Sequence, residues 1–181
     1  MSNLKGHEIR LKSRPAGMPT EANFEYVEAA VAQPKDGEVL VRNVWMSVDP
    51  YMRGRMVDRA SYVPPFQIGE ALTGGTIGQV IAAGKGAHFA VGDYLNHMLG
   101  WREYAVVGSS AMPQKVDPKL APVQSFLGAL GMPGLTAYAG LFKIGGFKPG
   151  ETVFVSAASG AVGGVVCQLA KARGAYVVGS A

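Results

Sequence analysis

The chain has 181 residues, a length that fits one domain, or one domain and part of another. Its 25 Gly and 11 Pro exceed their usual share and indicate many turns, while a hydrophobic fraction of 48% excludes a disordered chain. Lysine and arginine number 17 against 13 aspartate and glutamate residues, and no run of them forms a basic stripe for nucleic acid.

The single cysteine, Cys167, excludes an intramolecular disulfide and any cysteine-based zinc cluster. No apolar run follows the basic residues near the N-terminus, so we expect no signal peptide and a cytoplasmic location. Two long uncharged stretches, 120–142 and 152–170, are interrupted by proline or by small polar residues, which favours buried core over membrane spans. His7, His88 and His97 lack a metal-ligand spacing, and we expect them at the surface or in loops.

Four short β-like runs with turn residues between them precede residue 120, at 24–30, 38–48, 74–83 and 101–107. The run at 38–48 has apolar residues on both faces, which predicts a strand with little solvent on either side. Many short strands without helices between them predict a small β-barrel or sandwich.

The pattern changes near residue 120 to alternating helix and strand. Pro133 suits a helix start, and four apolar residues share one face of that helix: Leu135, Tyr138, Ala139 and Phe142. The apolar run 152–156 predicts a fully buried parallel strand, followed by an amphipathic helix that ends at Gly174 and by a strand at 175–179. Residues 152–181 therefore predict one βαβ unit.

A turn rich in small residues lies between that strand and that helix. Residues 158–163 read Ala-Ser-Gly-Ala-Val-Gly, a variant of the dinucleotide-binding turn. Gly160 lets the backbone approach a pyrophosphate, Gly163 lets the helix pack against the strand, and the helix start offers free N–H groups. Nucleotide binding is the favoured interpretation, and a tight turn without ligand is the alternative.

The end of the last strand bears on which nucleotide is bound. An NAD site usually has an acidic residue there for the ribose hydroxyls, whereas this chain reads Gly-Ser-Ala at 179–181. Ser180 leaves room for a 2′-phosphate and carries no negative charge that would repel it. The sequence therefore favours NADP over NAD.

Three segments together resemble one enzyme family. They are Asp-Pro-Tyr-Met-Arg-Gly-Arg-Met at 49–56, Gly-Met-Pro-Gly-Leu-Thr-Ala-Tyr at 131–138, and the turn 158–163. In order and spacing they are similar to the zinc-independent medium-chain dehydrogenases/reductases of the leukotriene B4 dehydrogenase/prostaglandin reductase and NADPH-dependent curcumin reductase type. The resemblance implies a GroES-like β-barrel domain at 1–120 and, at 121–181, the first βαβ unit of a Rossmann domain.

The same resemblance implies a function and a set of site residues. The activity would be NADPH-dependent reduction of the C=C bond of α,β-unsaturated ketones or aldehydes. Tyr51 would line the substrate pocket, with a packed aromatic as the alternative role. Thr136 and Met132 would approach the nicotinamide, and four residues would hold the pyrophosphate: Gly160, Ala161, Val162 and Gly163. No residue is assigned to catalysis itself.

Several alternatives remain. Gly69-Glu70 lacks the histidine of the zinc-dependent branch, which agrees with a metal-free site. Arg53, Arg55 and Arg59 belong either to a solvated loop or to an anion site. Quinone reduction and a non-enzymatic GroES-like binding module are the competing functions.

The length bears on activity, because a whole Rossmann domain needs two mononucleotide-binding halves and only 18 residues follow Gly163. We therefore expect an N-terminal fragment that binds NADPH weakly and does not turn over by itself. Family members are often homodimers, so the resemblance implies a homodimer for the full-length protein.

Overall fold

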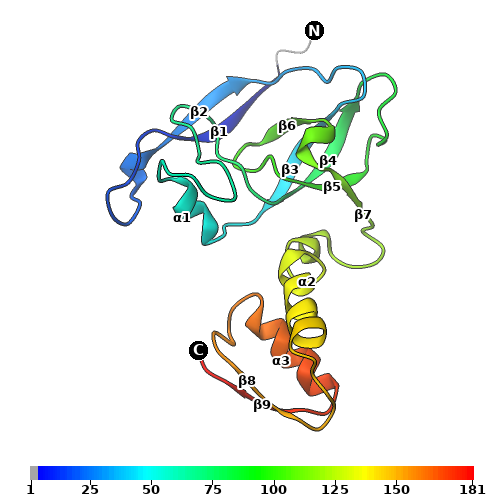
Figure 1. Cartoon of the computed structure of the whole chain (residues 1–181). Helices are drawn as coiled ribbons and strands as arrows, with labels where there is room; N and C mark the ends of the chain where they lie inside the picture. Colours follow the sequence, from blue (N-terminus) through cyan, green and yellow to red (C-terminus); the bar gives the residue numbers. More distant parts are fainter. Residues whose placement is uncertain (1–3) are drawn as a thin grey trace. The chain divides into compact units, whose positions relative to one another are not determined.

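The computed structural model describes residues 4–181 and divides into two compact units. The first unit ends at Val123 and the second runs from Gln124 to Ala181. Figure 1 shows the strands of the first unit in blue to green and the helices and strands of the second in yellow to red. The first unit is rich in strands and the second is α/β, which confirms the fold class expected from the sequence.

A five-stranded antiparallel sheet forms the centre of the first unit, in the order β6-β3-β4-β5-β7. Its members are β3 (Val39–Met46), β4 (Thr76–Ala83), β5 (Tyr94–His97), β6 (Tyr104–Val107) and β7 (Gln114–Val116). The strands expected at 38–48, 74–83 and 101–107 are confirmed as β3, β4 and β6. Strands β5 and β7 were not predicted, because they have only four and three residues.

Shorter elements surround this sheet. An antiparallel pair joins β1 (Lys5–Leu11) to β2 (Phe24–Ala30), with the short helix η1 (Glu21–Asn23) between them. The helix α1 (Tyr51–Arg55) follows β3, and η2 (Ser109–Ala111) precedes β7. The sequence predicted β2, but neither β1 nor α1.

Two hydrophobic clusters stabilise the first unit. One lies within the sheet and includes Val41, Val80 and Leu95, all almost completely buried. The other joins Leu11 of β1 to Met52 of α1 and to Phe66 and Leu72. The expectation that 38–48 is covered on both sides holds for the first half of β3 only, because Trp45 is 51% exposed.

The second unit begins with η3 (Val123–Leu127), which crosses the boundary, and continues with α2 (Met132–Tyr138) and the π-helical turn η4 (Ala139–Ile144). Then come β8 (Thr152–Val155), α3 (Gly163–Ala172) and β9 (Tyr176–Gly179). β8 and β9 are parallel, and α3 packs on both of them and on α2. The predicted βαβ unit is confirmed.

A glycine cap ends α3 sharply at its C-terminus. Gly174 has a φ of +84°, which favours glycine, and its N–H donates to the Lys171 carbonyl at 3.0 Å. The Ala175 N–H donates to the Ala170 carbonyl at 3.1 Å, which completes a Schellman cap. The sequence placed Gly174 at this position correctly.

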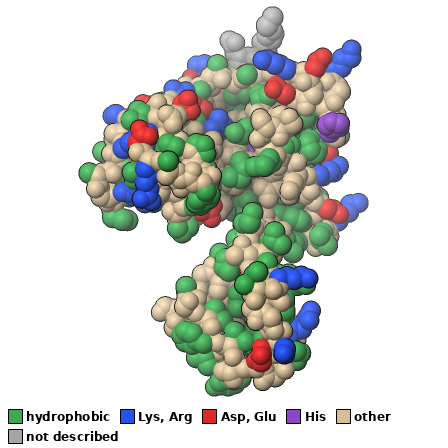
Figure 2. Space-filling model, viewed as in Figure 1, with side chains coloured by type: hydrophobic (Ala, Val, Ile, Leu, Met, Phe, Trp, Pro, Cys, Tyr) green, Lys and Arg blue, Asp and Glu red, His purple; other side chains and the backbone are tan. Residues whose placement is uncertain are grey.

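Two burial expectations for the second unit are wrong. α3 covers one face of the β8–β9 pair. On the other face Phe154 is 68% exposed and Tyr176 is 71% exposed, so β8 is not fully buried. In the segment from α2 to η4, the buried residues are Gly134, Ala137 and Leu141, not the predicted face that contains Leu135 and Tyr138. Figure 2 shows apolar side chains, in green, on the visible surface of this unit.

Candidate functional site

The turn between β8 and α3 is shaped by a close backbone approach. A Cβ on Gly163 would overlap the Ala157 carbonyl oxygen, and a Cβ on Gly160 would lie 3.1 Å from the same oxygen. Ala157 itself has a φ of +48°, an uncommon value for a residue with a side chain. The path of the chain therefore excludes a side chain at 163 and disfavours one at 160.

Hydrogen bonds tie this turn to the end of β9. The Ala158 N–H donates to the Ser180 carbonyl at 2.8 Å, and the Ser180 N–H donates to the Val155 carbonyl at 3.0 Å. Ser180 is exposed and directly follows β9. The backbone thus fixes Ser180 next to the turn, where its side chain faces solvent without an acidic neighbour at 179–181.

The start of α3 offers unpaired donors. Within residues 4–181, the N–H groups of Ala161, Val162 and Gly163 have no backbone acceptor, whereas the Gly164 N–H donates to the Gly160 carbonyl at 2.9 Å. Free N–H groups and the helix dipole both favour an anion at this end. The closely packed glycines and the three free donors fit a pyrophosphate group.

The two residues predicted near a nicotinamide lie on α2. Met132 is its first residue and Thr136 follows one turn later, and both are exposed, Met132 to 72%. Residues four apart in a helix lie on the same face. Their role as nicotinamide neighbours stays a prediction.

Tyr51 begins α1 and lines a cavity of about 180 Å³. Its ring packs against the cluster that contains Met52, while its hydroxyl is buried and has no hydrogen-bond partner among the described residues. Burial raises the pKa of Tyr51, and the nearby Asp49 carboxylate raises it further. A buried hydroxyl without a partner suits a group that binds a ligand oxygen.

Of the three arginines expected in a solvated loop or at an anion site, Arg53 and Arg55 lie in α1 and Arg59 is exposed after it. Arg55 is half-buried and lines the same cavity as Tyr51. For Arg55 the solvated-loop interpretation is therefore wrong. Burial lowers the pKa of Arg55 from its ordinary value.

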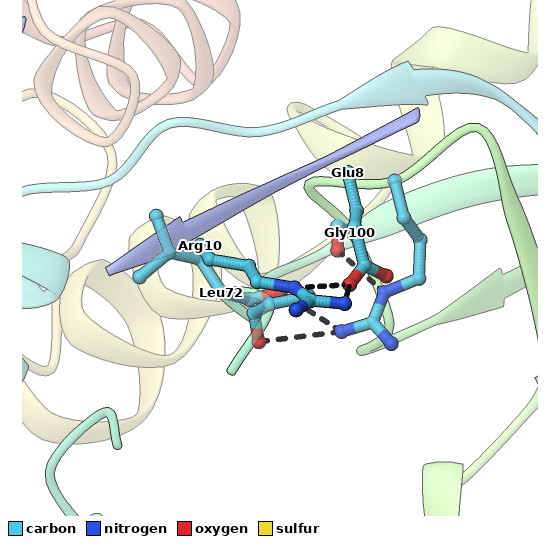
Figure 3. A network of polar contacts seen from close by, with 6 residues as sticks. Glu8, Arg10, Leu72 and Gly100 are labelled. Carbon is cyan, nitrogen blue, oxygen red and sulfur yellow. Dashed lines mark hydrogen bonds and ion pairs between the residues drawn. The ribbon is translucent and has the colours of Figure 1, made fainter. Parts of the chain in front are cut away.

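A polar network holds the chain segments near α1, and no local pattern in the sequence indicates it (Figure 3). Arg102 donates to the carbonyls of Gly100, Ala71 and Leu72, at 3.2, 3.3 and 3.2 Å. Glu8 accepts from Arg10 Nε at 2.6 Å in the same view. Because Leu72 packs in the same cluster as Met52 of α1, these bonds help to fix the helix that carries Tyr51.

His97 contradicts the expectation that the histidines lie at the surface or in loops. It is the last residue of β5 and only 1% exposed. Its Nδ1 accepts the Leu99 N–H at 3.2 Å, which requires a neutral ring with its proton on Nε2. Burial, with a contribution from the Arg102 charge, lowers the pKa of His97 to about 4.

Neither a metal-binding cluster nor a membrane-spanning helix occurs within residues 4–181. No three His, Cys, Asp or Glu side chains in that range are grouped so that they could hold a metal ion. No helix there is long and apolar enough to cross a membrane.

Comparisons with known proteins agree with one another. The family described as "N-terminal domain of oxidoreductase" matches residues 7–116. The NADPH-dependent curcumin reductase of Escherichia coli is 45% identical over 94% of this chain and 49% of its own length. The NADP(+)-dependent 2-alkenal reductase of Nicotiana tabacum is 42% identical over 98% of this chain and 53% of its own length.

Among solved structures, CurA from Vibrio vulnificus in complex with NADPH superposes with a TM-score of 0.86 at 42% identity, over 96% of this chain and 51% of that one. The chain thus spans about half the length of the curated relatives it matches.

Proposed function

The chain belongs to the medium-chain dehydrogenase/reductase family, and from this premise we propose that it serves the NADPH-dependent reduction of the C=C bond of α,β-unsaturated ketones or aldehydes. The proposal depends above all on the turn at 158–163, whose close backbone approach and free N–H groups fit a pyrophosphate. The names of the relatives, which include an NADPH-dependent curcumin reductase and a 2-alkenal reductase, support the substrate class.

We assign NADP(H) as the cofactor. Gly160, Ala161, Val162 and Gly163 would hold its pyrophosphate, and Ser180 would leave space for its 2′-phosphate. Met132 and Thr136 would lie toward the nicotinamide. When bound, the cofactor supplies a hydride for the β-carbon of the substrate.

We assign to Tyr51 the role of donating a hydrogen bond to the carbonyl oxygen of the substrate. Reduction of an enone places negative charge on that oxygen, and a fixed hydrogen-bond donor stabilises such charge. The Tyr51 hydroxyl is buried, unpaired and at a cavity, so it supports this role. The domain roles follow: residues 1–120 would hold the substrate, and 121–181 would begin the cofactor domain.

We further infer a small-molecule enone as the partner, a cytoplasmic location, and neither nucleic acid nor membrane as a partner. A modest net charge of +4 with scattered residues and a single cysteine support these inferences. Homodimer assembly rests on the family resemblance alone.

Cofactor choice is testable on this chain by saturation-transfer NMR, which detects weak binding. We expect NADPH to bind and NADH to bind at least about tenfold more weakly, and we expect Ser180→Asp to remove that preference because a carboxylate would repel the 2′-phosphate. Gly163→Ala should abolish binding of both. Equal binding of NADPH by the unsubstituted chain and by Gly163→Ala would refute the assignment of the turn.

A further inference from the structure

Tyr51 and Arg55 lie one helical turn apart on α1 and line the same cavity of about 180 Å³. The Tyr51 hydroxyl is buried and makes no hydrogen bond with a described residue. Two cationic side chains line this cavity, Arg55 and the exposed Arg59, and it is the charge of Arg55 that acts on the Tyr51 hydroxyl.

Three contacts fix the guanidinium of Arg55. Its Nε donates to the Pro64 carbonyl at 2.9 Å, and its Nη1 donates to the Thr73 hydroxyl at 2.9 Å. Its Cζ also lies 4.0 Å from the ring centroid of Phe66, a cation–π contact. The remaining guanidinium N–H groups keep a defined place beside the cavity.

A guanidinium carries donors only, so a phenol oxygen that faces it can act only as an acceptor toward it. The proton of that phenol must then point elsewhere. We propose, on the basis of the proposed function, that Arg55 is a positioning residue that directs the Tyr51 hydroxyl proton into the cavity, toward the carbonyl oxygen of the substrate.

The charges around Tyr51 support this arrangement. Burial raises the pKa of Tyr51, and Asp49 and Tyr62 raise it too, whereas Arg55 lowers it both by its charge and by the approach of its guanidinium to the phenol oxygen. Arg55 thus opposes the effect of burial and makes the phenol a stronger donor. Arg55 does not itself transfer a proton.

The test is the pH titration of Tyr51, followed by the NMR signal of its Cζ carbon in protein with 13C-labelled tyrosine. Tyr51→Phe identifies this signal among the seven tyrosines. In Arg55→Ala the titration midpoint of Tyr51 should shift upward, because the phenolate loses a positive neighbour. Arg55→Lys, which keeps the charge, should restore most of the original midpoint.

A merely structural role for Arg55 gives the opposite sign, since a loosened α1 would expose Tyr51 and lower its midpoint. Arg53→Ala is the matched control, because Arg53 lies on the same helix, donates to the Gly17 carbonyl at 2.6 Å and does not line the cavity. If the protein unfolds at high pH before Tyr51 titrates, the chemical shift of Tyr51 Cζ at pH 8 is compared with that of the unsubstituted chain. This shift should change in Arg55→Ala and not in Arg53→Ala.

An unchanged or lowered midpoint in Arg55→Ala, or an unchanged Cζ shift at pH 8, overturns the proposal. The measurement contains neither cofactor nor substrate. Its failure is therefore distinguishable from failure of the proposed function, which the NADPH binding experiment tests.

Discussion

At the scale of single residues, His97 shows how burial overrides an ordinary ionisation. The ring is enclosed in the sheet of the first unit, and its Nε2 has no partner among residues 4–181. A proton on Nδ1 would also break the bond from the Leu99 N–H. The protein must therefore keep His97 neutral to stay folded.

This predicts a pH-dependent stability. The pKa of His97 is about 4 in the folded chain and about 6.5 when unfolded, so its contribution is complete above pH 6.5 and is lost as the pH falls toward 4. Between pH 7 and pH 5, the free energy of unfolding should fall by about 2 kcal/mol more in the unsubstituted chain than in His97→Gln. Urea unfolding followed by tryptophan fluorescence measures both, and equal losses would contradict a buried neutral histidine.

The position of Tyr51 illustrates what local sequence can and cannot reveal. Its motif at 49–56 identified it as a candidate, but the place of the Arg55 guanidinium beside it depends on contacts with Pro64, Thr73 and Phe66, which only folding brings together. Arg102 was missed for the same reason, because two of its three carbonyl partners, those of Ala71 and Leu72, are about 30 residues away along the chain.

At the scale of elements, the strand–turn–helix of β8 and α3 could be predicted because its signals are local. A short apolar run, small residues at the turn and a terminal glycine each act within a few residues. The helix α1 was missed because five residues that include Gly54 show no apolar period. Strands β1, β5 and β7 are likewise defined by pairing with distant segments.

The turn supplies a matched pair of substitutions. Gly163→Ala places a methyl group against the Ala157 carbonyl and should destabilise the second unit by about 1–3 kcal/mol. Gly164→Ala meets its nearest atom, the Ala158 carbonyl oxygen, at an ordinary 3.4 Å and should stabilise α3 by up to about 1 kcal/mol. Amide hydrogen exchange in β8 and β9 measures both changes, and similar effects of the two would show that the turn is not tightly packed.

At the scale of the whole molecule, the second unit leaves one face of its two-stranded sheet uncovered. Residues paired across β8 and β9 share a face, so Phe154 and Val178 lie together, 68% and 40% exposed, with Tyr176 beside them. Exposed apolar strands of this kind promote association.

We therefore expect the chain to self-associate as its concentration rises. Phe154→Lys should shift the average mass toward the monomer, because it places a charge in the centre of the exposed face. Met18→Lys is the control, since Met18 is 86% exposed but lies in the first unit. Light scattering after size-exclusion chromatography measures the mass, and a monomer at every concentration would disprove the expectation.

The sequence by itself determined the order of strands and helices in the second unit, the turn at 158–163 and the family, because each depends on short motifs that can be read along the chain without knowing how it folds. Only the tertiary structure decided which of these surfaces are buried, where Arg55 and Arg102 bind, and why His97 is neutral. Burial and electrostatics depend on neighbours that the chain brings together from a distance, and no local pattern records them.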